Sequence, residues 1–144
     1  MSRPPRDPAQ PVIGRADYLR LGRQSGIMTG SAMAAYIYGL ARYGPGAQAG
    51  TLAFLTLTSA QLLHGLTARS EDRGADLPPN PLMRAGLLAG FGLLALSQFI
   101  PGLTSLLGAS RIGAADALVA GSAALASYFA NEAAKPPRKE VSHG

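Results

Sequence analysis

Two polar side chains interrupt a long apolar run near the middle of the chain. Gln61 and His64 are three residues apart, so a helix would place them on one face, and Thr58 lies three residues before Gln61. The carbonyl oxygen of Gln61 could bind a cation, and the imidazole of His64 could bind a metal ion or relay a proton. The alternative is that both side chains hydrogen-bond to neighbouring helices and hold them in register.

Polar residues at the ends of the apolar runs suit structural roles better. Asp116 lies where a helix would begin, and a carboxylate is favoured there by the positive end of the helix dipole. Glu132 and Lys135 are three residues apart at the end of the same run, which predicts an ion pair or an interfacial anchor. Ser97 and Gln98, near the end of another run, are expected to be wetted.

The sequence lacks the patterns that hydrolytic enzymes require. It contains no cysteine, which excludes disulfides, thiol catalysis and Cys-ligated metal sites. It also lacks a glycine-rich phosphate loop, a cluster of metal ligands and a nucleophile spaced to meet a base. No cofactor is therefore expected to bind within this chain.

Four runs with almost no charge organise the sequence. A membrane-spanning helix needs roughly 20 mostly apolar residues, because the hydrocarbon core of a bilayer is about 30 Å thick. The runs cover residues 24–41, 43–68, 85–110 and 117–131. We expect one transmembrane helix in each run, with an interruption at Pro101 in the third. Pro81, shortly before the third run, suits a helix-opening position.

The positive charges alternate between the two ends of these predicted helices. Eleven of the thirteen Lys and Arg residues flank one end, and only Arg42 and Arg111 flank the other, where Tyr36, Tyr38 and Tyr43 are also expected. Because cations collect on the cytoplasmic side, both termini and the central loop are predicted to be cytoplasmic. The predicted fold class is all-α: a polytopic protein of the plasma or inner membrane, with four transmembrane helices, N-in and C-in.

Length and composition are compatible with one domain. The 144 residues divide into a cytoplasmic lead-in at 1–20, a membrane region at 21–135 and a cytoplasmic tail at 136–144, which contains His143. The net charge of +5 could indicate nucleic-acid binding, but the cations lie at segment ends and not on a basic face interleaved with aromatic residues. No nucleic-acid partner is expected. A soluble helical bundle would need charged residues on every turn, which these runs lack.

Small residues recur every fourth position along three of the predicted helices. Such residues let helix backbones approach closely in lipid, where little hydrophobic force drives helices together. A genome that uses Ala and Gly freely would give the same pattern, and neither interpretation identifies an activity. The repeats are Gly22, Gly26, Gly30 and Ala34 in the first helix, Gly86 and Gly90 in the third, and Ala117 and Gly121 in the fourth.

Several stretches, in order, resemble the C-terminal membrane region of P-type cation-transporting ATPases. MSRPPRDPAQPV at residues 1–12 is similar to the segment that follows the sixth membrane helix of those pumps. FLTLTSAQLLHGLTARSE at residues 54–71 resembles their eighth helix. The motifs that open the ninth helix and close the tenth have counterparts in Asn80-Pro81 and in Asn131, Glu132 and Lys135. The resemblance implies the seventh to tenth membrane helices of a pump, in agreement with the charge count.

The resemblance also implies a role for Gln61. It corresponds to the eighth-helix position at which some calcium pumps place a glutamate ligand and others place glutamine. A neutral amide binds a divalent cation more weakly than a carboxylate does, so a second calcium site that depends on that glutamate would be weaker here. His64 falls where many relatives have Asn or His. The family's phosphorylated aspartate and main ion ligands are absent, so ATP and magnesium are expected only for a complete pump.

Two classes of function remain open at this point. The first is a membrane-embedded support segment of a P-type cation pump, present as a fragment or a separately encoded piece. Its partners would be the bilayer, the remaining helices and cytoplasmic domains of the pump, in cis or in trans, and the transported cation. The alternative is a stand-alone small four-helix membrane protein that binds or regulates another membrane protein. An oligomeric transporter is disfavoured because no charge lies in the middle of any run.

Overall fold

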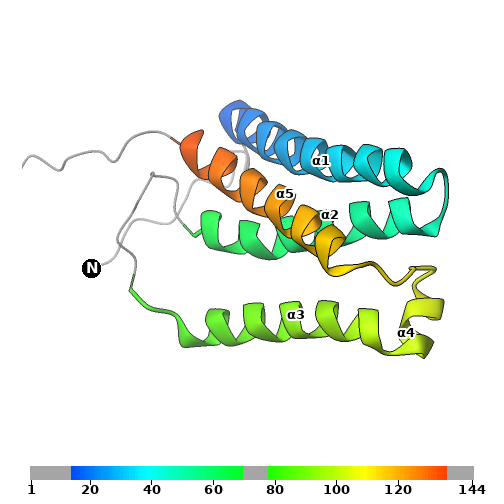
Figure 1. Cartoon of the computed structure of the whole chain (residues 1–144). Coiled ribbons are helices and arrows are strands. Elements are labelled where there is room, and N and C mark those ends of the chain that lie inside the picture. The colour runs from blue at the N-terminus through cyan, green and yellow to red at the C-terminus, as the bar shows by residue number, and fades with distance from the viewer. Residues whose placement is uncertain (1–13, 70–77, 136–144) are drawn as a thin grey trace, which may run out of the picture.

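The computed structural model describes residues 14–69 and 78–135 of the chain (Figure 1). All of the regular elements in these residues are helices, which confirms the all-α class. In order they are α1 (Arg15–Tyr43), α2 (Ala47–Thr67), α3 (Pro81–Phe99), α4 (Pro101–Leu106) and α5 (Ala114–Ala133). The motif predicted at residues 1–12, the loop at 70–77 and the tail with His143 lie outside the described residues.

The long helices alternate in direction. The start of α1, the end of α2, the start of α3 and the end of α5 all lie at one end of the molecule (Figure 1). The α1–α2 turn and α4 lie at the opposite end. This is the up-and-down order that the charge pattern predicts, with α1 and α3 running one way and α2 and α5 the other.

Side chains and proline define where three of the helices begin. The backbone N–H groups of Gly14 and Gly113 donate to carboxylates three residues ahead, Asp17 at 2.9 Å and Asp116 at 3.3 Å. Asn80 caps α3, because its side-chain oxygen accepts from the N–H of Met83 at 3.0 Å. The predictions that Asp116 and Pro81 open helices are confirmed.

The first helix is longer than its apolar run. It begins at Arg15 and not at residue 24, because charged residues end an apolar run without ending a helix. Asp17 stabilises the added turns at its N-terminus, where Arg20 pairs with it at 3.4 Å. The third run is divided as expected: Pro101 has no N–H to continue α3, so the chain begins the short α4 there.

Three of the helices, α1, α2 and α5, pack together as one unit. Their shared core contains small and aliphatic side chains: Ala35, Leu52, Leu55 and Ala120. The closest approach is at Gly39 of α1, where an added Cβ would lie 2.7 Å from the Cα of Ala49 in α2. Only glycine fits at this position, because a backbone atom fills the space that a side chain would need.

The remaining long helix, α3, stands apart from this unit. It packs against α2 and α4, and none of its Cα atoms lies within 8 Å of a Cα of α1 or α5. Its tightest contact is at Gly90, where an added Cβ would lie 2.8 Å from Cδ2 of Leu62. Only Ser97 is buried in α3, whereas Leu82, Leu88 and Phe99 are exposed.

Of the described helices, α3 alone is both long and apolar enough to cross a membrane. The other three long helices carry more polar and small side chains, such as the threonines of α2 and the serines of α5. The prediction of four spans therefore stays a prediction. The repeat at Gly22, Gly26 and Gly30 lies on an exposed face of α1, and no described atom comes within 4 Å of where their Cβ atoms would stand.

Candidate functional site

The residues predicted to carry chemistry, Gln61 and His64, lie in the second half of α2. Gln61 is exposed on the surface of the described chain, and His64 is half-buried. The Oγ1 of Thr67 lies 2.9 Å from the Nδ1 of His64 and donates to the His64 carbonyl oxygen at 2.9 Å. His64 is thus held by a residue of its own helix. The alternative that His64 hydrogen-bonds to a neighbouring helix is not seen within the described residues.

The described residues do not bring further ligands to Gln61 and His64. No group of three or more His, Asp or Glu side chains able to hold a metal ion occurs in residues 14–69 and 78–135. A divalent cation such as calcium takes six to eight oxygen ligands. Gln61 could therefore supply at most one ligand of such a site.

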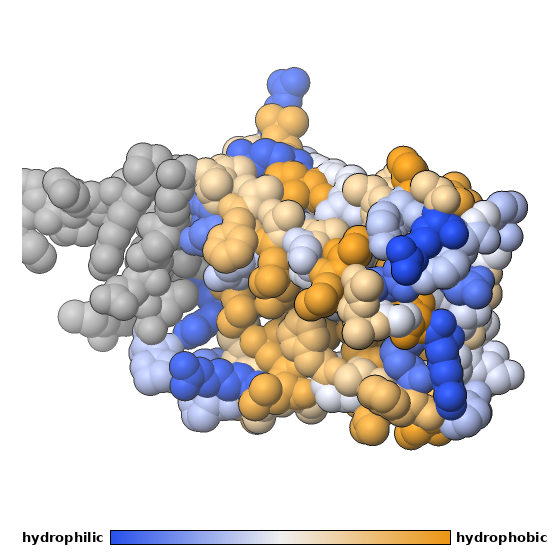
Figure 2. All heavy atoms as spheres, in the orientation of Figure 1, coloured by the Kyte–Doolittle hydropathy of each residue, from blue (hydrophilic) through white to orange (hydrophobic). Residues whose placement is uncertain are grey.

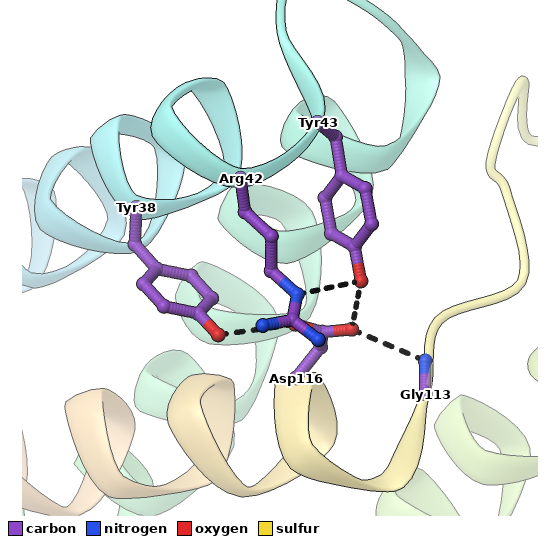
Figure 3. A network of polar contacts seen from close by, with 5 residues as sticks. All are labelled: Tyr38, Arg42, Tyr43, Gly113 and Asp116. Atoms are coloured by element: carbon purple, nitrogen blue, oxygen red, sulfur yellow. Dashed lines mark hydrogen bonds and ion pairs between the residues drawn. The ribbon is translucent and has the colours of Figure 1, made fainter.

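A second polar site joins α1 to α5 at the end of the molecule near α4 (Figure 3). Its centre is the carboxylate of Asp116, which is only 1% exposed. Tyr43 donates to Oδ2 at 2.5 Å, Tyr38 donates to Oδ1 at 3.3 Å, and Arg42 approaches Oδ1 at 3.3 Å through Nε. The N–H of Gly113 adds a donor to Oδ2 at 3.3 Å.

Arg42 holds this cluster together from its exposed side. Its Nε also donates to the Tyr43 hydroxyl at 3.0 Å, and its guanidinium lies 5.4 Å from the centre of the Tyr43 ring. A buried carboxylate is stable only when paired and hydrogen-bonded, and Asp116 has four such partners. The role of the cluster is structural, since its hydrogen bonds and ion pair join the end of α1 to the beginning of α5.

Sequence reasoning placed the members of this cluster at the same end of the molecule but did not connect them. Arg42 and the tyrosines were expected near the outer interface, and Asp116 was expected only to open its helix. The signal that could have joined them is charge: within the predicted four-helix topology, Asp116 is the only acidic residue at that end, and Arg42 is one of two cations there.

The opposite end of α5 carries the predicted ion pair. Lys135 lies 2.6 Å from Glu132, which confirms that prediction, and the lysine is buried with 6% of its surface exposed. Asn131, next to Glu132, is also buried, and its Oδ1 has no hydrogen-bond partner among the described residues. The burial of these polar groups shows that the end of α5 packs against other parts of the protein.

A cleft of about 570 Å³ lies between α3 and α5, beside the contact of α3 with α2. Its walls come from α2, α3 and α5 and are mainly apolar, with Leu55, Phe91 and Gly121 among the lining residues. Three lining residues are polar: Ser59 in α2, Gln98 at the end of α3, and Arg111 in the segment that joins α4 to α5. The expectation of wetted side chains was wrong. Ser97 is buried and donates to the Leu94 carbonyl at 2.7 Å because α4 folds back over it. Both polar atoms of the Gln98 amide are buried as well.

Comparison with known proteins places these features in a family. A family model described as the C-terminus of cation-transporting ATPases matches residues 1–136 of the chain. Searches among curated proteins and among solved structures gave no match. The matched residues include all five described helices and the earlier resemblance at residues 1–12 and 54–71. The chain therefore belongs to the family formed by the C-terminal membrane region of cation-transporting ATPases.

Proposed function

We propose that the chain is the membrane-embedded support segment of a P-type cation pump, in which it braces the helices that carry the ion. The observation that carries this proposal is the match to the family over residues 1–136, which includes every described helix. In this proposal the whole chain is one domain. Residues 1–20 lead into a membrane region at 21–135, and residues 136–144 form a cytoplasmic tail.

The proposed topology has four membrane-spanning helices, α1, α2, α3 and α5, with both termini in the cytoplasm. The alternating directions of these helices support it, as does the distribution of cations (Figure 1). Arg42 and Arg111 lie at the end near α4, whereas the other described cations lie at the opposite end: Arg15, Arg20, Arg23, Arg69, Arg84 and Lys135. The positive-inside rule assigns the second end to the cytoplasm of a plasma or inner membrane.

The surface that would meet the transport helices is the open glycine face of α1. Gly22, Gly26 and Gly30 have no described atom within 4 Å of their would-be Cβ atoms, in contrast to the filled contact at Gly39. Small residues let a helix approach another backbone closely, which is the main attraction between helices in lipid. We assign this glycine face to the preceding helices of the pump, in cis or in trans.

Within such a pump Gln61 would contribute one neutral oxygen to the transported cation. Its exposure on the described chain leaves the amide free to face the transport helices. His64, held by Thr67, is the weaker candidate for a ligand. ATP hydrolysis, with its magnesium, belongs in this proposal to pump regions outside the chain.

The topology can be tested directly because the chain has no cysteine of its own. Four variants each carry one thiol at an exposed position: Ala16→Cys, Pro79→Cys, Gly46→Cys and Leu107→Cys. In intact cells a membrane-impermeant maleimide should label the thiols at 46 and 107. The thiols at 16 and 79 should react only after the membrane is permeabilised.

Labelling of all four thiols in intact cells, or recovery of the chain from the soluble fraction, would overturn the membrane topology. Labelling of 46 alone would reduce the number of spans and contradict the four-helix arrangement. Each variant is its own control, since the same thiol must react fully in permeabilised cells to show that it is accessible.

The alternative function is a small stand-alone membrane protein that binds another membrane protein through the same glycine face. Gly26→Cys with a photoactivatable crosslinker distinguishes the two. Crosslinks to the transport helices of a cation pump support the proposal, and crosslinks confined to an unrelated membrane protein support the alternative. Leu118→Cys, on an exposed position of α5, serves as the control for non-specific capture.

A further inference from the structure

The cleft between α3 and the three-helix unit has the dimensions of one half of a bilayer. On α3 it extends from Phe91 to Phe99, and along the beginning of α5 it extends from the N-cap residue Gly113 to Gly121. Eight residue steps along a helix cover about 12 Å, and one leaflet contributes roughly 15 Å of hydrocarbon. An extended apolar chain lying in the cleft would therefore run parallel to the helices through about one leaflet.

The charged group of the cleft lies at one of its ends. Arg111 and Gln98 lie toward α4, whereas the lining residues farther from it are apolar or small: Phe91, Gly121 and Ser59, which has the one hydroxyl among the lining residues. In Figure 2 hydrophobic residues cover the middle of the molecule and hydrophilic ones lie at both ends. A site with a charged mouth and an apolar interior favours an amphiphilic ligand over a wholly apolar one.

Gln98 gives independent support for a ligand. Both polar atoms of its amide are buried, and neither has a hydrogen-bond partner among the described residues. An amide buried without a partner costs free energy, and a turn of the Gln98 side chain into the cleft that it lines would let a group from outside the chain satisfy it. An ester carbonyl can accept from its nitrogen, and a glycerol hydroxyl can donate to its oxygen.

Arg111 selects the charge of that ligand. It is exposed, and its Nη2 donates to the Phe99 carbonyl at 3.4 Å, which leaves other guanidinium N–H groups for a phosphate. The nearest acidic residue on α5, Asp116, is buried and turned toward Arg42 and Tyr43 of α1. Its charge is paired there and does not line the cleft.

We propose that this cleft holds one anionic glycerophospholipid, with an acyl chain between α3 and α5, its ester at Gln98 and its phosphate at Arg111. The lipid fills the cleft between α3 and α5. In the orientation of the proposed function, on which this inference rests, the lipid belongs to the outer leaflet.

The test uses the full chain in a mild detergent with added phosphatidylglycerol or phosphatidylcholine, and counts retained lipids by native mass spectrometry. The unaltered chain should retain one phosphatidylglycerol and bind it more tightly than phosphatidylcholine. Arg111→Gln should weaken phosphatidylglycerol binding about tenfold and remove the preference, because a charge-assisted contact is lost. Gln98→Leu should weaken both lipids alike, since the ester is common to them.

A cleft-filling pair of variants separates this site from general lipid adsorption. No described atom lies within 4 Å of a Cβ at either Gly121 or Gly92, but only Gly121 lines the cleft. Gly121→Leu should therefore abolish retention of both lipids, and Gly92→Leu should leave it unchanged. Circular dichroism of each variant checks that its helices are intact, and the Gln98→Leu result stands if Gly121→Leu fails to fold.

Equal retention by Gly121→Leu and the unaltered chain would overturn the proposal, and so would a dimer that binds no lipid, in which a second copy covers the cleft. A chain that passes the cysteine-labelling test but retains no lipid refutes this inference and leaves the proposed function intact. A chain that fails the labelling test refutes the proposed function itself.

Discussion

At the scale of single residues, the best-defined polar site of the described chain is structural and not catalytic. The carboxylate of Asp116 is buried and accepts from two tyrosines and a backbone N–H beside Arg42. Asp17 makes the same helix-capping bond at the start of α1, but its side chain is 41% exposed and its ion-pair partner among the described residues is Arg20. Comparing the two aspartates therefore separates the stability contributed by the buried cluster from the stability contributed by the helix cap.

Asp116→Asn should destabilise the chain by about 1–3 kcal/mol, because donors arranged around a carboxylate would then face an amide. Asp17→Asn should cost less than about 1 kcal/mol, as expected for an exposed ion pair. The free energy of unfolding of each variant can be measured in detergent micelles by circular dichroism. Equal losses would mean that the cluster adds nothing beyond the helix cap.

Gln61→Leu, introduced into an assembled pump, should raise the cation concentration needed for half-maximal ATPase activity. The reason is that the transported cation would lose one oxygen ligand. Gln48→Leu is the matched control, since Gln48 is an exposed glutamine at the opposite end of the same helix. If the cation dependence of Gln61→Leu equals that of the control, Gln61 has a role in packing alone.

At the scale of helices, small residues serve opposite purposes at different positions. Gly39 and Gly90 are close-approach points within the chain, whereas Gly22, Gly26 and Gly30 face open space. The four-residue spacing in the sequence correctly predicted a helix contact at Gly90. It could not distinguish a surface that packs against another helix of this chain from one that is left exposed. Gly39 was not among the repeats considered, although Ala35, four residues before it, gives the same spacing and is buried in the core.

Gly39→Ala should destabilise the chain by about 1–3 kcal/mol, because its Cβ would lie 2.7 Å from a backbone atom of Ala49 and α1 would have to move away from α2. Gly90→Ala meets only the end of the Leu62 side chain, at 2.8 Å, which can rotate aside. Its cost should be clearly smaller in the same unfolding measurement. A larger loss at Gly90 would contradict the packing described here.

The helices themselves could be predicted from the sequence more fully than the contacts between them. Charge-free runs and Pro81, Pro101 and Asp116 indicated where helices lie, begin or break, since these features act through the local backbone. The start of α1 at Arg15 was missed because charge limits an apolar run but not a helix. The cluster around Asp116 could not be derived, because it depends on how α1 and α5 rotate toward each other.

At the scale of the whole molecule, the chain is a three-helix unit with a fourth long helix attached on one side. α1, α2 and α5 share a core, whereas α3 reaches that unit through α2 alone and leaves the cleft beside α5. Helix association in lipid depends on packing contacts, so a helix with few of them is held less firmly. The position of α3 relative to α5 should therefore vary more than the positions within the three-helix unit.

Spin labels can measure this difference in lipid nanodiscs. One labelled pair, Ile37→Cys with Leu125→Cys, reports on α1 and α5, and a second pair, Leu88→Cys with Leu125→Cys, reports on α3 and α5; all three positions are exposed. The second distance distribution should be broader than the first. Distributions of equal width would mean that α3 belongs to a single rigid four-helix bundle. If joining the chain to the rest of a pump narrows only the second distribution, the neighbouring helices supply the contacts that α3 lacks here.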